Sequence, residues 1–222
     1  MTIPFGALIS EVARGKSISR ILTNSALCEW SEEIRGVVLD LACGANPSYW
    51  RVLGLQGQRA RLIGVDCNPS CRPAVVADLV HSIPICSESC DVAILSSYLY
   101  VPAEPEQILR EAWRVLRKGG LLVLTAPLIF PHNPEPTDHW RFTEEGLRCL
   151  LSRSRFLIEE LTPTGGRWTG AAYLISPFLR PRWLTAVVVY WVALKLDFWS
   201  DHWYKGLPRC PIAYCVKARK PG

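Results

Sequence analysis

Short apolar runs recur along most of the chain, separated by longer stretches of mixed character. Runs of strand length lie at residues 37–41, 62–65, 75–77, 92–95 and 121–125, with two later runs at 156–161 and 212–217. Apolar runs of this length are typical of parallel strands that are buried on both faces. The stretches between them are long enough for crossover helices. The pattern therefore predicts an α/β fold with a doubly wound, seven-stranded and mostly parallel sheet, covered by helices on both faces.

Apolar residues recur at helical spacing in two further places. Residues 1–35 show this spacing and are expected to form an N-terminal helical cap. A second helix is predicted at 104–117, with Pro105 in the first turn, where proline is tolerated. Gly119 and Gly120 are expected to end this helix, because glycine can adopt the left-handed conformation that closes one.

The end of the first strand carries small and polar residues in the sequence LDLACGAN, which contains Asp40, Ala42, Gly44 and Asn46. Ligands of open parallel sheets bind at the carboxyl ends of the strands, where small residues let a ligand approach the backbone. Asp66 ends the second strand, 20 residues after Asn46. An acid near this spacing can accept hydrogen bonds from a ribose diol. The two features together predict a nucleotide-containing ligand.

The segments LDLACGAN and RVLRKGG resemble the D-x-G-C-G turn and the R-V-L-x-P-G-G segment of class I S-adenosylmethionine-dependent methyltransferases, in particular the type 11-like group. The resemblance extends over residues 37–125 with the strands in the same order. It implies a Rossmann-like methyltransferase fold, S-adenosylmethionine as cofactor and methyl transfer by in-line displacement. The chain would then be one domain, with a helical cap at 1–36, a cofactor-binding core at 37–126 and a substrate side at 127–222.

The resemblance also implies which residues bind the cofactor, and all of them stand at the carboxyl ends of the first four strands. They are Asp40, Ala42, Cys43, Gly44, Asn46, Asp66, Cys67, Asp78, Leu79, Ser96 and Ser97. The first turn would hold the methionine part, the second strand end the ribose, the third the adenine, and the two serines would face the methyl group. Without the resemblance, Asp78 is equally a surface turn acid, and the serines are caps of a strand end.

The turn departs from the family pattern, because Ala42 and Asn46 replace glycines and Tyr100 stands where many relatives carry histidine. A catalytically inactive, methyltransferase-like binding or scaffold protein is therefore the alternative function. A nicotinamide-dependent oxidoreductase is excluded, because its G-x-G-x-x-G fingerprint would need glycine where Ala42 and Pro47 stand.

The loop after the fifth strand, HNPEPTDHWRFTEEGL, offers candidate acceptor-side residues at the same sheet edge as the cofactor. It is similar to a loop found in a subset of these methyltransferases. His132, Asp138 and His139 are the candidate catalytic residues, although His132 and Asp138 can equally anchor the loop. Thr143 is expected to cap the following helix. The acceptor is expected to be a small molecule or a lipid- or glycan-linked group.

The segment WLTAVVVYWVALKLDFW at 183–199 is apolar on every face until Lys195. Its uncharged part is short for a membrane span, which needs about 20 residues. We expect a helix inserted before the last strand that covers the acceptor pocket. A peripheral membrane contact is the alternative, because aromatic residues and Arg180 and Arg182 flank the segment as interfacial anchors do.

The distribution of charge along the chain bears on the kind of partner that is expected. Residues 1–138 carry 12 basic and 14 acidic side chains, whereas residues 139–222 carry 13 and 6. The basic residues lack the clustering of a nucleic-acid module, so a nucleic-acid partner is not expected.

The chain opens without a basic segment followed by an apolar stretch, which favours the cytoplasm, with membrane association as the alternative. The nine cysteines are expected to be free thiols with no metal site, because their CxxxC pairs do not match zinc-binding spacing.

Overall fold

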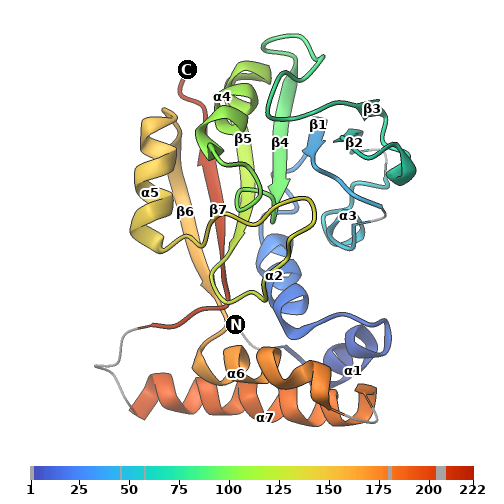
Figure 1. Cartoon of the computed structure of the whole chain (residues 1–222), viewed down its shortest axis with the longest axis vertical. Helices are drawn as coiled ribbons and strands as arrows, with labels where there is room; N and C mark the ends of the chain where they lie inside the picture. The colour runs from blue at the N-terminus through green and yellow to red at the C-terminus, as the bar shows by residue number, and fades with distance from the viewer. Residues whose placement is uncertain (1–2, 46, 58, 180–181, 204–208) are drawn as a thin grey trace.

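A seven-stranded mixed sheet forms the centre of the molecule in the computed structural model, which describes residues 3–45, 47–57, 59–179, 182–203 and 209–222 (Figure 1). All seven apolar runs form strands. They are β1 (Gly36–Leu41), β2 (Ala60–Asp66), β3 (Val75–Val76), β4 (Cys90–Ser96), β5 (Leu116–Pro127), β6 (Leu157–Thr164) and β7 (Ala213–Arg219). Their order in the sheet is β3-β2-β1-β4-β5-β7-β6. The sequence-based expectation of an α/β sheet is confirmed.

The first five strands run parallel, and β7 runs antiparallel to both of its neighbours. The strand order reverses direction at β1, where the chain crosses from the β2–β3 side to β4. Ligand sites of open sheets lie at such a switch point, outside the carboxyl ends of the strands. A ligand site is therefore expected at the ends of β1 and β4.

Successive residues of the strands point to opposite faces, and each face has its own hydrophobic core. Leu39, Leu95 and Leu124 pack in one cluster with α4 (Pro105–Val115) and α5 (Glu144–Arg153). Their neighbours Val38, Ile94 and Val123 pack in a second cluster with α2 (Ile18–Cys28) and α3 (Tyr49–Val52). This alternation confirms that helices cover both faces.

Helix α4 ends two residues earlier than predicted. Its last residue is Val115, and Leu116 is already extended, with ψ 138°. Leu116 is fully buried and pairs with Cys90 of β4, so its backbone belongs to the sheet and not to the helix. Of the two glycines, Gly119 alone has a positive φ, +73°, and it lies near the beginning of β5. The prediction that Gly119 and Gly120 cap the helix was wrong.

The N-terminal helical stretch consists of two helices, α1 (Phe5–Ala13) and α2. The chain turns between them at Gly15, where φ is +77°, a conformation that glycine adopts without strain. The Ser17 hydroxyl then accepts a hydrogen bond from the Arg20 amide at 3.3 Å and caps α2. The turn allows α1 to pack away from the sheet while α2 stays on it.

An apolar helical insertion separates β6 from β7, as predicted. It consists of α6 (Arg167–Ile175), a 3₁₀ turn η2 (Ser176–Phe178) and the long helix α7 (Arg182–Trp203). Figure 1 shows α6 and α7, in orange, lying side by side across one end of the molecule, next to α1 in blue. Buried residues of α1, α2, α6 and α7 form a third hydrophobic cluster. The insertion is thus packed onto the domain through its inner side.

Candidate functional site

The turn after β1 presents open backbone at the switch point of the sheet. Ala42 and Gly44 both adopt left-handed conformations, with φ of 58° and 61°. A Cβ atom built on Gly44 would meet no atom within 4 Å, so the space in front of this residue is open. The turn therefore offers a cradle that a ligand can approach closely. Asn46, the last predicted residue of this turn, lies outside the described residues.

Asp40 points away from the open side of the turn and into the protein. Its carboxylate is fully buried and accepts hydrogen bonds from the Tyr49 hydroxyl at 2.9 Å and from the Trp50 indole N–H. Burial raises the pKa of Asp40 to about 7, against the effect of these two donors. The expected contact between Asp40 and the methionine part is not supported. Asp40 instead fixes α3 to the end of β1.

Asp66 joins the ends of β1 and β2. One of its carboxylate oxygens accepts a hydrogen bond from the Gly44 amide at 2.8 Å, and the other accepts one from the Asn68 amide at 2.9 Å. The side chain thus lies beside the glycine that leaves the open space. These hydrogen bonds give Asp66 a structural role, and its role in holding a ribose stays a prediction.

A cavity of about 440 Å³ opens between this turn, α2 and the loops after β4 and β5. From the predicted cofactor residues, Ala42, Cys43, Gly44, Ser96 and Ser97 line it. Burial raises the pKa of the Cys43 thiol to about 12, so Cys43 forms an unreactive wall. A second hollow of about 690 Å³ lies on the other side of the turn and shares its residues 43–45. Both volumes are in the range of small-molecule sites.

The end of β4 is fixed to β5 by one buried side chain. The Thr125 hydroxyl lies 3.3 Å from the Ser96 hydroxyl and 3.1 Å from the Ser97 hydroxyl, and it accepts a hydrogen bond from the Ser97 amide. Ser97 has a positive φ of 53° and is exposed. Thr125, which the motifs did not indicate, therefore holds the two predicted serines at the cavity edge.

The end of β3 differs from the expectation. Leu79 is 1% exposed, and its side chain belongs to the main hydrophobic core. The Asp78 carboxylate accepts hydrogen bonds from the Val80 amide and from His81, which lower its pKa and make it a turn acid at the surface. Cys67 is exposed and does not line either hollow.

Tyr98, which follows β4, is a half-buried ring packed against the main hydrophobic core. Burial raises its pKa to about 12. The ring had no sequence signal, because its packing depends on tertiary contacts.

Asp138 anchors the loop after β5. Its carboxylate pairs with the Arg141 guanidinium at 2.5 Å and accepts a hydrogen bond from the Asn133 amide at 2.9 Å. These contacts hold the pKa of Asp138 well below its usual range. Arg141 lies 5.6 Å from the ring centres of Tyr100 and Phe130, which form the cavity wall. Of the two alternatives for Asp138, the structure favours loop anchoring, because such a carboxylate is a weak base.

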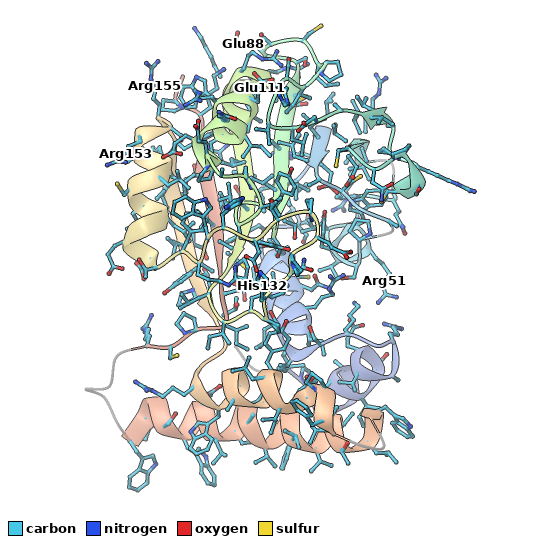
Figure 2. All side chains as sticks on the ribbon, viewed as in Figure 1. Arg51, Glu88, Glu111, His132, Arg153 and Arg155 are labelled. Carbon is cyan, nitrogen blue, oxygen red and sulfur yellow. The ribbon has the colours of Figure 1, made fainter. Side chains whose placement is uncertain are left out.

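His132 and His139 are exposed and do not line the cavity. His139 contributes its backbone, whose amide donates to the Tyr100 carbonyl at 2.8 Å. Figure 2 shows His132 on the loop that passes in front of α2 in that view. The structure therefore gives neither histidine a catalytic position. Asn133, between them, does reach the cavity and donates to the Tyr100 hydroxyl at 3.1 Å.

Helix α2 supplies a cavity wall that the sequence patterns did not reveal. Ser19, Arg20, Thr23 and Asn24 all line the cavity. Asn24 is buried and donates a hydrogen bond to the Ser48 hydroxyl at 2.9 Å. A polar residue on the apolar face of a predicted helix was the signal that could have indicated this wall.

The expected covering of the cavity by residues 183–199 is not what the structure shows. Within the described part of the chain, the insertion reaches the cavity through Tyr173 of α6, and α7 contributes no lining residue. Helix α7 lies one layer further out, on α6 and α1. Thr143 caps α5 as predicted, since its hydroxyl accepts a hydrogen bond from the Gly146 amide at 3.1 Å.

No group of three or more metal-ligating side chains occurs among the residues that the structure describes. All nine cysteines are free thiols in the structure.

Ala42 stores backbone strain in the first turn, and Ala42→Gly is expected to release it. A non-glycine residue in the left-handed region costs roughly 1 kcal/mol. We therefore expect the free energy of unfolding to rise by about 0.5–1 kcal/mol, less than the full strain because glycine loses more chain entropy. Chemical denaturation measures this change. The control Ala45→Gly, at a neighbouring position without positive φ, should destabilise instead.

Comparison with known proteins agrees with this geometry. Residues 39–124 match the family described as a methyltransferase domain. A curated relative, an uncharacterized 37.1 kDa protein in transposon TN4556 of Streptomyces fradiae, is 34% identical over 101 residues, which cover 40% of this chain. The chain spans 29% of that relative's length.

Two solved structures show the same fold at low sequence identity. The [4+2]-cyclase SpnF is 20% identical, with a TM-score of 0.58 over 88% of this chain and 81% of that chain. An S-adenosylmethionine-dependent methyltransferase from Methanosarcina mazei is 17% identical, with a TM-score of 0.53 over 83% and 92% of the two chains. The family match and the fold coincide on the strands that carry the open turn.

Proposed function

We propose that the chain is a class I S-adenosylmethionine-dependent methyltransferase and that it transfers a methyl group to an acceptor bound in the 440 Å³ cavity. The main support for this proposal is that the open turn at Gly44 and the aromatic and amide side chains of the substrate side line the same cavity. The acceptor is a small molecule or a lipid- or glycan-linked group. Because the same fold occurs in a [4+2]-cyclase, fold alone does not establish the reaction.

The residues of the cavity fit the methionine part of the cofactor. Arg20 is the only charged side chain that lines the cavity among the described residues, and it lies with Asn24 and Ser48 on the side of the turn. A guanidinium and neighbouring polar groups suit a carboxylate. Asp66, beside Gly44, suits the ribose hydroxyls. When bound, S-adenosylmethionine supplies an electrophilic methyl group, and these side chains orient it.

The opposite wall positions the acceptor. Tyr100 and Phe130 pack with ring centres 5.5 Å apart, and Asn133 and Tyr173 complete this end of the cavity. In-line transfer depends mainly on alignment and on the exclusion of water. No carboxylate or imidazole lines the described cavity to act as a base. The acceptor is therefore expected to offer an atom with a free lone pair at neutral pH, such as an unprotonated amine or an ionised oxygen.

Transfer of a radiolabelled methyl group from S-adenosylmethionine into low-molecular-weight, glycan and lipid extracts tests this function. Label in one extract, lost with Asn133→Ala, is the expected result. Tight binding of S-adenosylmethionine without transfer to any extract would instead establish the inactive binding protein.

Arg20→Met is expected to weaken binding of S-adenosylmethionine and S-adenosylhomocysteine about 10- to 100-fold, the usual effect of losing a charge-assisted hydrogen bond. Adenosine, which lacks the methionine part, should bind the variant and the parent equally. Calorimetric titration measures both. Arg153→Met, on the exposed end of α5, is the matched control and should change neither affinity. An equal loss of adenosine binding would show that Arg20 supports the fold.

A further inference from the structure

Most of the exposed large apolar side chains gather on the insertion and on α1. Seventeen such side chains are exposed among the described residues, and only Val76, Trp140 and Leu157 lie outside α1, α6, η2 and α7. Figure 2 shows bulky side chains extending from α7 away from the rest of the molecule. Isolated exposed apolar residues are ordinary, but a gathering of this kind marks an interaction surface.

We call the exposed side of α7 and the adjacent end of α1 the outer face, formed by Phe5, Leu184, Val188, Trp191, Phe198 and Trp199. From Leu184 to Phe198 the α7 residues recur at spacings of four, three and seven, and Trp199 adjoins Phe198, so they share one side of the helix. Phe5 of α1 contacts Trp191 edge to face, with ring centres 5.8 Å apart. Phe198 and Trp199 are 64% and 60% exposed. The outer face is thus continuous along a helix of 22 residues, about 33 Å long.

The sequence of α7 and of the residues that precede and follow it is basic, which indicates what this face meets. Residues 180–209 carry five basic side chains, Arg180, Arg182, Lys195, Lys205 and Arg209, and two acidic ones. Asp197, one of these two acids, points inward and accepts hydrogen bonds from the Trp168 and Thr169 amides. Lys195 lies on the outer face, 5.8 Å from the Trp191 ring centre. Aromatic side chains combined with basic ones are typical of helices that lie in the interface of an anionic membrane.

The same helix is long and apolar enough to span a membrane, since its window Trp183–Ser200 has a mean hydropathy of 1.2 and is 22% buried. Its inner side argues against that orientation. Ala186, Val187, Tyr190 and Ala193 are buried in the cluster formed with α1 and α2. A spanning helix would have to leave this core and would expose the apolar surface of the domain beneath it to water, which is unfavourable. The helix therefore stays packed and lies along the membrane plane.

We propose that the outer face docks the protein onto an anionic lipid bilayer, with α7 in the headgroup region. The inference goes beyond the proposed methyl transfer, and docking does not depend on it.

The path of a lipid-linked acceptor to the cavity, in contrast, rests on the proposed function. A groove beneath α7 between Gly15, Ser176 and Trp183 shares Ser17 with the acceptor cavity. A lipid-linked acceptor would thus have a short path from the membrane to the cavity.

Sedimentation with vesicles tests the docking without any cofactor. The probe is phosphatidylcholine mixed with phosphatidylglycerol, and the variant combines Val188→Ser, Phe198→Ser and Trp199→Ser. We expect the parent to sediment with the vesicles and the variant to bind at least tenfold more weakly. The control combines Val76→Ser with Leu157→Ser, two exposed residues elsewhere, and should bind like the parent. Because all five residues are exposed, no variant removes core packing.

The other outcomes overturn the proposal. A parent that stays in the supernatant, or a variant that binds as well as the parent, would show that the outer face does not meet lipid. Release of all bound protein in about 1 M salt, where charges are screened beyond about 3 Å, would show adsorption by charge alone. If gel filtration gives a dimer for the parent and a monomer for the variant, a second copy covers the face. S-adenosylmethionine affinity, measured on the same samples, stays unchanged in the variant and keeps this test separate from that of the proposed function.

Discussion

Gly44→Ala is expected to lower the affinity for S-adenosylmethionine at least tenfold, with a small loss of stability. The added methyl group would project into the open space in front of the turn, where the proposed cofactor would lie. Gly44 has a φ of +61°, so an alanine at this position would also be strained by roughly 1 kcal/mol. Calorimetric titration measures the affinity, and chemical denaturation measures the stability.

Gly54 provides a matched control for the strain. It has a φ of +67°, and a Cβ atom built on it would also meet no atom within 4 Å, but it lines neither hollow. Gly54→Ala should therefore lose the same stability as Gly44→Ala while keeping the parent affinity. If both variants bind the cofactor equally well, the ligand does not approach the backbone at Gly44.

Asp40→Asn is expected to become more stable relative to the parent as the pH rises from about 4 to 7. In the folded parent the pKa of Asp40 is about 7, mainly because the carboxyl group is buried, whereas the unfolded value is close to 3.8. Between these values the folded state holds a proton that the unfolded state has released. The free energy of unfolding of the parent therefore falls as the pH rises through this window. The asparagine variant has no proton to lose.

The size of this effect follows from the pKa difference, at about 1.4 kcal/mol per unit, so the upper bound is roughly 4 kcal/mol. Denaturation of parent and variant over the pH range measures the difference, in which the contributions of all other groups cancel. Asp78→Asn is the control with the opposite sign, because hydrogen bonds lower the pKa of Asp78 and stabilise its charged form. A difference between parent and Asp40→Asn that does not change with pH would show that Asp40 is solvated in the folded state.

The strands and the cofactor turn could be predicted because both are encoded locally. A buried parallel strand needs an apolar run, and the turn after β1 needs small residues, so both leave a continuous signal in the sequence. The helix before LRKGG shows the limit of such signals. Glycines at 119 and 120 are typical of a helix end, but the pairing of Leu116 with Cys90 takes the backbone into the sheet earlier. Tertiary pairing overrode the local preference there.

The acceptor side could be predicted only in part, because its residues come together from distant segments. His132 and His139 are chemically versatile and were natural candidates, yet both point to solvent. The side chains that do reach the cavity, Arg20 of α2 and Tyr173 of α6, stand about 150 residues apart in the sequence and are brought together by packing alone. Asp138 was placed in the correct loop, but its pairing with Arg141 makes it an anchor.

Asp197 points inward and connects α7, which forms the outer face, to α6, which lines the cavity. Its carboxylate accepts hydrogen bonds from the Trp168 amide at 2.8 Å, the Thr169 amide at 3.0 Å and the Thr169 hydroxyl at 2.6 Å, all in the first turn of α6. Tyr173, one turn further along α6, lines the cavity. A displacement of α7 would therefore move the helix that carries Tyr173, both through this carboxylate and through the apolar packing of the two helices, and so would reach the acceptor wall.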